Sequence, residues 1–144
     1  EIFHGNADVL KTVLYAVYHE TSEVMTGDLP TPTKYVNPEI KAAYKDIEKG
    51  ECEKLLSTLP NELKSDFEKY VLPDENSEEY KIMKCADKIS AYIKCVEEVN
   101  SGNKEFIKAK EVIYKDILNN ERDEVKYFVK HILPRYELTL DELE

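Results

Sequence analysis

Residues 18–32 read YHETSEVMTGDLPTP, and this stretch decides where the first helix of the chain ends. Before it, Asn6 is a good N-cap, and apolar residues then follow at helical spacing. We therefore predict a helix over residues 7–23 that stops near Gly27. The two prolines at the end of the stretch restrict the residues before them to extended conformations, so they predict a rigid turn.

Three ionisable side chains of this stretch, His19, Glu20 and Glu23, lie close together on the predicted helix. At 100° per residue, Glu23 projects about 40° and Glu20 about 100° from His19. The apolar Val9 and Val13 project into the same sector, so the three polar groups are expected at the edge of a buried face. Buried carboxylates repel one another unless a proton or cation intervenes, and a divalent metal with nitrogen and oxygen ligands meets that need. The alternative is a solvated helix end whose acidic residues cluster by chance.

Asp87 is a second acidic residue that we predict beside a buried helix face. It lies in a helix predicted over residues 77–99, where Met83 is among the neutral side chains of its sector. An aspartate in that position needs a cationic or hydrogen-bonding partner. A metal would satisfy it, and so would a salt bridge to Lys84 or Lys94 or a hydrogen bond to a hydroxyl group.

Asp28 follows Gly27 in the turn segment and has two interpretations. Its side chain could bond its own backbone as an Asx-turn and hold the loop. It could equally contact a substrate, and the residues alone leave both possibilities open.

The remaining sequence predicts further helices, because no segment shows the convincing alternation of a strand. Asn37 and Pro38 open the second helix as N-cap and first helical residue. Helices are predicted over residues 38–50 with continuation to Leu56, and over 60–71, 77–99, 104–118 and 121–132. We predict an all-α protein with a single domain over residues 1–144.

The composition excludes several classes of function. The 144 residues carry a formal net charge of −10 with lysines interleaved among glutamates, so nucleic acid is not an expected partner. No apolar run approaches the roughly 18 residues that a membrane helix needs. The three cysteines, Cys52, Cys85 and Cys95, form no CxxC pair, which argues against a disulfide framework and favours the reducing cytoplasm.

Three stretches together resemble a known family. They are LYAVYHETSEVMTGDLPTPTKYVNPEIKAAYKDIEK, CADKISAYIKCVEEVNSGNKEF and the ending LTLDEL. Their combination of H-x-x-x-E, TGDLPTP and a later AD helix is similar to the HD-domain 5′-deoxynucleotidases of bacteria, the YfbR type. The likeness runs from about Asn6 to the C-terminus. It implies an HD-domain-like helical bundle, usually a homodimer, which here lacks the N-terminal helices of the family.

The resemblance also implies an activity and a set of site residues. Enzymes of this family remove phosphate from deoxynucleoside 5′-monophosphates with a divalent metal, typically cobalt or manganese, with magnesium possible. By position, His19 and Glu20 occupy the family's His-Asp pair and Asp87 its distant metal-binding aspartate. Glu23 matches the glutamate that activates water, and Asp28 matches the aspartate near the substrate.

Two departures from the family pattern keep a second hypothesis open. The pair reads His-Glu in this chain, and the resemblance implies that the position of the family's first metal-binding histidine comes before residue 1. The leading hypothesis is a metal-dependent phosphohydrolase. The alternative is a non-catalytic or truncated HD-fold module with a degenerate metal site.

Overall fold

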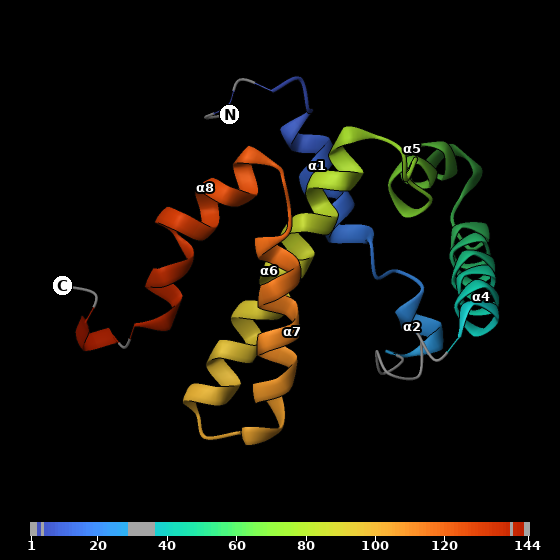
Figure 1. The fold of residues 1–144 in the computed structure, drawn as a ribbon. Helices are drawn as coiled ribbons and strands as arrows, with labels where there is room; N and C mark the ends of the chain where they lie inside the picture. The colour runs from blue at the N-terminus through green and yellow to red at the C-terminus, as the bar shows by residue number, and fades with distance from the viewer. Residues whose placement is uncertain (1–2, 4, 29–36, 139, 143–144) are drawn as a thin grey trace. The chain divides into compact units, whose positions relative to one another are not determined.

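The computed structural model describes residues 3, 5–28, 37–138 and 140–142, which form helices joined by turns (Figure 1). No strand occurs among these residues, so the all-α prediction is confirmed. The chain divides into two compact units: residues 7–81 form one, and residues 1–6 together with 82–144 form the other. No helix in the described parts of the chain is long and apolar enough to cross a membrane.

The unit of residues 7–81 is a small helical cluster. Helix α5 packs against both α1 and α4, and the short α2 packs against α4. Buried Leu56 and Val71 form its apolar centre together with Cys52, and Tyr18 and Phe67 pack against them. The helices of this unit are α1 (Val9–Tyr18), α2 (Glu23–Thr26), α4 (Pro38–Ser57) and α5 (Asn61–Val71), and α6 begins in it at Glu78.

Helix α4 confirms both its predicted start and its predicted continuation. The Asn37 side chain accepts a hydrogen bond from the backbone N–H of Ile40, and Pro38 is the first helical residue. The helix runs through Gly50 because the residues beyond it, Cys52 and Leu56, bury their side chains in the core of the unit.

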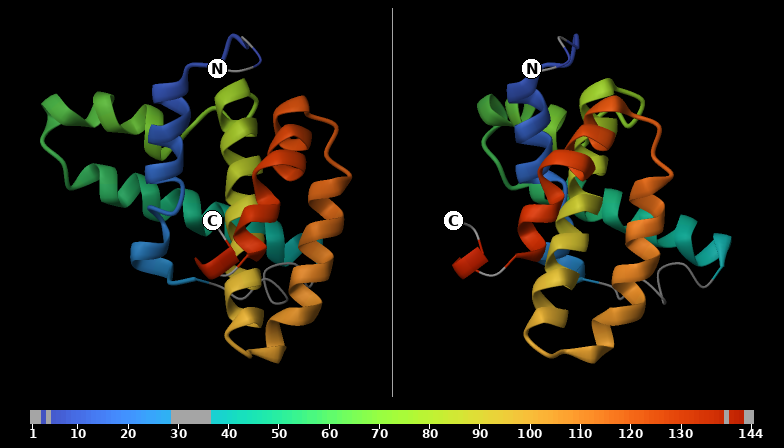
Figure 2. Two further views of the ribbon diagram at one scale, coloured as in Figure 1. Left: turned by 90° about the vertical axis from the view of Figure 1, so that its left-hand side faces the viewer. Right: turned by 60° about the vertical axis from the view of Figure 1, so that its left-hand side comes forward.

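The other unit is built on α6, a helix of 23 residues. Helix α7 comes next in the chain and lies beside α6 (Figure 2). Its core contains Ile89, Tyr92, Val96, Ile117, Val125 and Leu133. Gly102 ends the turn after α6 with a φ of 91°, and the Asn103 backbone N–H bonds the Glu98 carbonyl. Its elements are α6 (Glu78–Asn100), η1 (Lys104–Phe106), α7 (Ile107–Leu118), α8 (Asp123–His131), η2 (Leu133–Glu137) and η3 (Leu140–Glu142).

The prediction for the first helix is wrong in its extent. A single helix was expected over residues 7–23 with Asn6 as N-cap, whereas α1 spans Val9–Tyr18 and its N-cap is Asp8. The Asp8 carboxylate accepts a hydrogen bond from the Lys11 backbone N–H at 3.0 Å. An aspartate that reaches the third N–H of the helix fixes the start two residues later than expected.

The predicted buried face of this helix is also wrong. Val9 and Val13 are each 52% exposed, while Tyr15 is only 2% exposed. Tyr15 packs edge-on against Tyr70, and Tyr18 stacks on the same ring. Aromatic rings bury more apolar area than valines do, so the tyrosine face of α1 is the one that packs in this unit.

Candidate functional site

The first helix ends in a turn over residues 19–22, and side chains of that turn bond its last carbonyls. His19 Nδ1 lies 2.8 Å from the Ala16 carbonyl oxygen. The Thr21 hydroxyl donates to the Tyr18 carbonyl at 2.7 Å, and the Thr21 backbone N–H bonds the same oxygen at 3.1 Å. These contacts compete with continuation of the helix, because they use the carbonyls that residues further along would need.

This turn, and not a helical face, brings His19 and Glu20 together. The expectation that His19, Glu20 and Glu23 share one face of a continuous helix is wrong, because α1 stops at Tyr18. His19 Nε2 lies 3.5 Å from Glu20 Oε1. Glu23 instead begins α2, with its backbone N–H bonded to the Glu20 carbonyl at 2.9 Å.

The hydrogen bond at His19 Nδ1 determines the chemistry of the other ring nitrogen. A carbonyl oxygen only accepts, so Nδ1 carries the proton and donates to Ala16. In the neutral ring the lone pair is then on Nε2, which is buried and faces the Glu20 carboxylate. This is the usual arrangement of a metal-binding histidine, whose second nitrogen donates to a backbone carbonyl. The nitrogen and carboxylate can share a proton or bind a cation.

Helix α4 contacts the buried side of the turn of residues 19–22. Ser22 is 5% exposed, and its backbone lies against the sulfur of Cys52. Burial raises the pKa of the Cys52 thiol, so this cysteine is a neutral packing residue. The buried Ser22 therefore anchors the turn of residues 19–22. The Glu20 side chain, in the same turn, is 62% exposed.

Glu23 and Asp28 lie at opposite ends of the segment that contains α2. Glu23 is half-buried at the start of the helix, and Asp28 is exposed just beyond its end. Between them, Gly27 has φ 67° and ψ 168°, a conformation that side chains with a Cβ rarely adopt. The Tyr44 hydroxyl donates to the Gly27 carbonyl at 3.3 Å, so α4 also holds this end. The rigid turn predicted from the two prolines lies outside the described residues.

Asp87 belongs to the other unit and lies in the middle of α6. Its side chain is 34% exposed, between buried Met83 and exposed Ala91. The Lys84 ammonium donates to Asp87 Oδ2 at 2.6 Å. The predicted edge position and the predicted alternative of a Lys84 salt bridge are therefore both observed.

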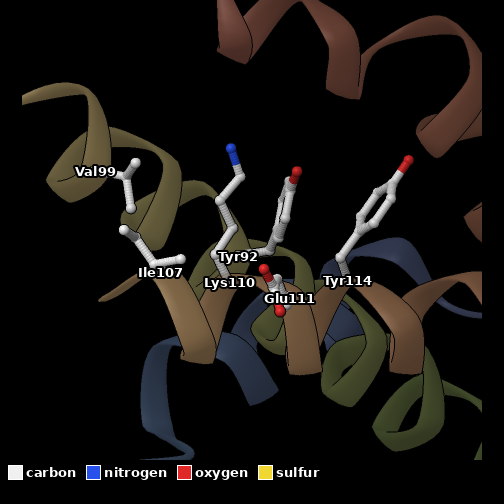
Figure 3. A pocket seen from close by; sticks show the side chains of 6 residues that line it. All are labelled: Tyr92, Val99, Ile107, Lys110, Glu111 and Tyr114. Carbon is white, nitrogen blue, oxygen red and sulfur yellow. The ribbon is translucent and has the colours of Figure 1, made fainter. Parts of the chain in front are cut away.

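A hollow of about 400 Å³ in this same unit has different chemistry (Figure 3). The rings of Tyr92 and Tyr114 stack at 5.1 Å, and the Tyr92 hydroxyl donates to Glu137 Oε1 at 2.7 Å. Burial and this hydrogen bond raise the pKa of Tyr92. The lining residues include no histidine or cysteine, and they are Tyr92, Val99, Ile107, Lys110, Glu111 and Tyr114. The hollow therefore does not offer the mixed donors of a transition-metal centre.

Sequence reasoning missed one polar contact near the start of α1. The Glu79 carboxylate accepts hydrogen bonds from the Asp8 backbone N–H and the Lys11 side chain. The partners are separated by 71 and 68 residues. No local sequence signal pairs residues so far apart, so only the fold reveals this contact.

The described residues form a helical scaffold, and in the turn after α1 a histidine whose Nδ1 carries the proton faces a carboxylate. The profile of the family described as 5′-deoxynucleotidase YfbR-like matches residues 1–136. The chain belongs to this family.

Several curated relatives are similar over almost the whole chain. A 5′-deoxynucleotidase of Vibrio vulnificus is 45% identical over 142 residues, which cover 98% of this chain and 73% of the relative. One of Vibrio cholerae is 44% identical over 146 residues, with 98% and 73% covered. One of Yersinia pestis is 45% identical over 144 residues, with 98% and 72% covered. The predicted family is therefore confirmed.

Proposed function

We propose that this protein is a metal-dependent phosphohydrolase that removes phosphate from deoxynucleoside 5′-monophosphates. Family membership and the names of the relatives support the reaction and the substrate class. Within the molecule, the single observation that carries the proposal is the turn at His19. There the Nδ1–Ala16 hydrogen bond directs the lone pair of Nε2 beside the Glu20 carboxylate.

The proposed metal ligands are His19, Glu20 and Asp87. An imidazole nitrogen with carboxylate oxygens suits manganese or cobalt, whereas magnesium prefers a set made mostly of oxygen. Glu20 replaces the aspartate of the family, and its longer side chain still ends in a carboxylate on the same exposed turn. At Asp87 the incoming cation would have to displace or share the charge of Lys84, which now neutralises that carboxylate.

Glu23 is the proposed general base. A bound divalent cation lowers the pKa of water and shields the charge of a phosphate. The half-buried Glu23 carboxylate would accept the proton of the attacking water, which then adds in line at phosphorus as the nucleoside oxygen leaves. Glu23 is the first residue of α2, and its backbone N–H bonds the Glu20 carbonyl. This bond holds the proposed base, Glu23, close to the proposed metal ligand, Glu20.

Asp28 is the proposed substrate-binding residue. It follows Gly27, whose carbonyl is held by the Tyr44 hydroxyl. The exposed Asp28 carboxylate would accept hydrogen bonds from the nucleotide, and its charge disfavours a phosphate directly beside it. We therefore assign it to the nucleoside side of the substrate.

Phosphate release tests this proposal. Deoxynucleoside and ribonucleoside 5′-monophosphates would be compared with manganese or cobalt present, and again after chelation. We expect release that favours the deoxy set and needs the metal. Glu23→Gln should lower kcat by about 10²- to 10⁴-fold, because an amide cannot take the proton.

Glu53→Gln is the matched control for that variant. Glu53 is an exposed carboxylate on α4 that lies 3.9 Å from the Lys49 ammonium. Its substitution removes the same charge and should leave kcat unchanged. Equal activity of the Glu23→Gln variant and the wild type would overturn the assignment of the base.

The second candidate function is a non-catalytic helical module. The short Lys84–Asp87 ion pair favours it, because that carboxylate already has a cationic partner. Metal analysis of the purified chain separates the two functions. One manganese or cobalt ion per chain supports the enzyme, whereas a metal-free chain that releases no phosphate supports the module.

We further propose a cytoplasmic homodimer. The three cysteines are unpaired thiols, as a reducing compartment requires. Val9, Leu10, Val13 and Val17 leave an exposed apolar row on α1 that a second copy could cover. Light scattering should give twice the 16.7 kDa chain mass, and a single-chain mass would contradict the dimer.

A further inference from the structure

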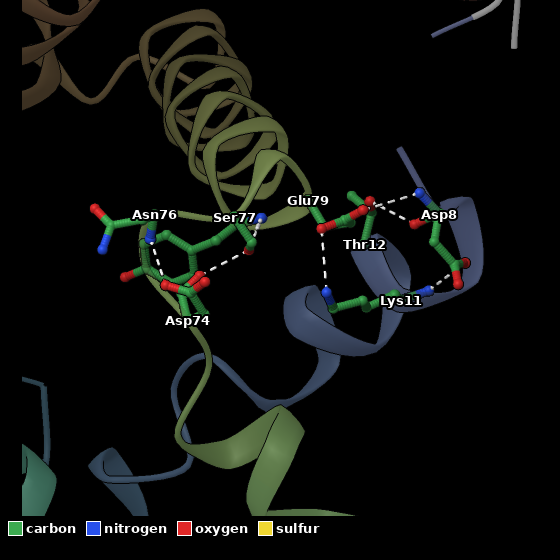
Figure 4. A network of polar contacts seen from close by, with 8 residues as sticks. Asp8, Lys11, Thr12, Asp74, Asn76, Ser77 and Glu79 are labelled. Atoms are coloured by element: carbon green, nitrogen blue, oxygen red, sulfur yellow. Dashed lines mark hydrogen bonds and ion pairs between the residues drawn. The ribbon is translucent and has the colours of Figure 1, made fainter. Parts of the chain in front are cut away.

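Glu79 joins the start of α1 to the start of α6 (Figure 4). Its Oε1 accepts a hydrogen bond from the Asp8 backbone N–H at 3.1 Å. Its Oε2 accepts one from the Lys11 ammonium at 3.2 Å. The Glu79 side chain is only 13% exposed, so both carboxylate oxygens are used in a setting largely removed from water.

The partners of Glu79 also build the first turn of α1. The Asp8 side chain caps the Lys11 backbone N–H at 3.0 Å. The Thr12 hydroxyl donates to the Asp8 carbonyl at 2.8 Å. The first turn of α1 is therefore held by its own hydrogen bonds as well as by Glu79. The Glu79 carboxylate fixes the place of this turn relative to the first turn of α6.

The start of α6 is equally well fixed on its own side. The Ser77 hydroxyl donates to the Asp74 carbonyl at 2.7 Å and accepts from the Tyr80 backbone N–H at 3.3 Å. The Asn76 backbone N–H bonds Asp74 Oδ1 at 2.9 Å. Tyr80 adds a second contact to α1, since its ring meets that of Tyr15 edge-on at 6.3 Å.

Helix α1 leads directly to two of the proposed metal ligands. It has ten residues and is followed at once by His19 and Glu20. A continuous helix transmits the position of its first turn to its last turn.

We infer that Glu79 is a positioning residue, which sets the metal ligands His19 and Glu20 by fixing the start of the helix that leads to them. The inference rests on the proposed function, because it assumes that His19, Glu20 and Asp87 hold one cation. Glu79 touches neither substrate nor metal in this role. Residues that orient metal ligands typically change metal affinity by about 10- to 100-fold when they are replaced.

Manganese binding to the purified full chain tests the inference. The dissociation constant for Mn²⁺ would be read from the signal of the free ion in electron paramagnetic resonance. The temperature should be one at which circular dichroism shows every variant folded. We expect Glu79→Gln to raise that constant about tenfold, because the amide nitrogen that replaces one carboxylate oxygen donates and cannot accept from the partner at that position. Saturating Mn²⁺ should restore most of the kcat.

Glu75→Gln is the matched control. Glu75 forms a 2.6 Å ion pair with Lys45 in the same unit, and its side chain is 48% exposed. Its substitution should leave the Mn²⁺ dissociation constant unchanged. Lys11→Arg, which keeps the charge at Glu79, should also bind Mn²⁺ as the wild type does.

Each outcome has a defined meaning. A Glu79→Gln variant that melts earlier but binds Mn²⁺ with wild-type affinity would show a merely structural role and overturn the inference alone. A wild-type chain that binds no Mn²⁺ would overturn the proposed function as well. If Glu79→Gln fails to fold, Lys11→Met provides the test, because it keeps the contact between Glu79 and the Asp8 backbone. A raised Mn²⁺ dissociation constant of this variant supports the inference, and an unchanged constant overturns it.

Discussion

The proposed metal ligands come from two regions that are built in different ways. Asp87 lies in the middle of α6, a helix of 23 residues with a regular hydrogen-bond ladder. His19 and Glu20 lie in a turn between α1 and α2, held by individual contacts such as His19 Nδ1 to Ala16 and Thr21 to Tyr18. The helix positions its ligand through the backbone, whereas the turn positions its ligands through side chains.

This difference decides how each region responds to substitution. In α6, a side chain can change without moving Asp87, and only a break in the backbone shifts it. In the turn, the loss of one hydroxyl group can displace a proposed metal ligand. The replacement of a glycine in a strained backbone conformation can have the same effect. The substitutions below break each region in turn and then weaken the contact that joins their helices.

The largest effect on stability is expected from Ala91→Pro in α6. The exposed Ala91 donates its backbone N–H within the helix, and proline both removes that donor and clashes with the carbonyl of Asp87. We expect a loss of about 3 kcal/mol in the free energy of unfolding, measured in urea. Ala91→Gly, the control, should cost only about 1 kcal/mol. Equal costs for both variants would mean that α6 does not depend on this bond.

Gly27→Ala should have the next largest effect. Nothing lies within 4 Å of an added Cβ at Gly27, so the cost comes from its φ of 67° and ψ of 168°. Strain of this kind costs about 1–3 kcal/mol. Gly50→Ala gives the opposite sign, because Gly50 is helical in α4 with equally open surroundings, and alanine stabilises a helix by about 0.5–1 kcal/mol. The unfolding midpoints of the two variants should therefore move in opposite directions.

Thr21→Val tests the turn itself. Valine keeps the shape of threonine but loses the hydroxyl that donates to Tyr18 at 2.7 Å. We expect a loss of about 1 kcal/mol in stability together with weaker Mn²⁺ binding. Thr58→Val is the matched control, since the Thr58 hydroxyl makes the same bond to Leu55 at the end of α4. A similar stability loss without any change in Mn²⁺ affinity is expected there.

The smallest effect concerns the pH dependence of Glu79. The Asp8 backbone N–H, then the backbone N–H of Glu79 itself and the Lys11 ammonium, lower the pKa of the Glu79 carboxyl in the folded state. Its contribution to stability is therefore complete above the unfolded-state pKa of about 4.3 and is lost as pH falls through the lower folded-state pKa. The stability difference between wild type and Glu79→Gln should be constant near neutral pH and vanish in acid. A difference that grows in acid would contradict this sign.

Much of the fold could be predicted from the sequence, because local signals determine most helix ends. Asn37 and Pro38 start α4 as expected, and α6 lies within one residue of its predicted range. The prediction of the buried face of the first helix was wrong, because its valines follow a clear helical period and yet lie on the exposed side. The tyrosines at positions 15 and 18 bury more area, and their partner Tyr70 is distant in sequence.

The candidate site was predictable in its residues but not in its geometry. The residue types of His19, Glu20 and Glu23 and their resemblance to a family motif indicated a metal site. Helical periodicity could not show that the helix stops at Tyr18, because the decisive bonds come from His19 and Thr21 side chains to the backbone. The support from Cys52 depends on packing between α2 and α4. Whether the chain is one domain and whether these residues hold metal both stay predictions.

The central claim is that His19, Glu20 and Asp87 hold one divalent cation, and Mn²⁺ stoichiometry tests it most directly. Free Mn²⁺ would be measured by electron paramagnetic resonance against the wild type and two aspartate variants. Asp87→Asn removes a proposed ligand, while Asp116→Asn removes an exposed carboxylate that is likewise paired to a lysine, Lys88, at 3.0 Å. We expect one Mn²⁺ per wild-type and Asp116→Asn chain, and binding weakened more than tenfold in Asp87→Asn. Equal Mn²⁺ binding by both aspartate variants would contradict the claim.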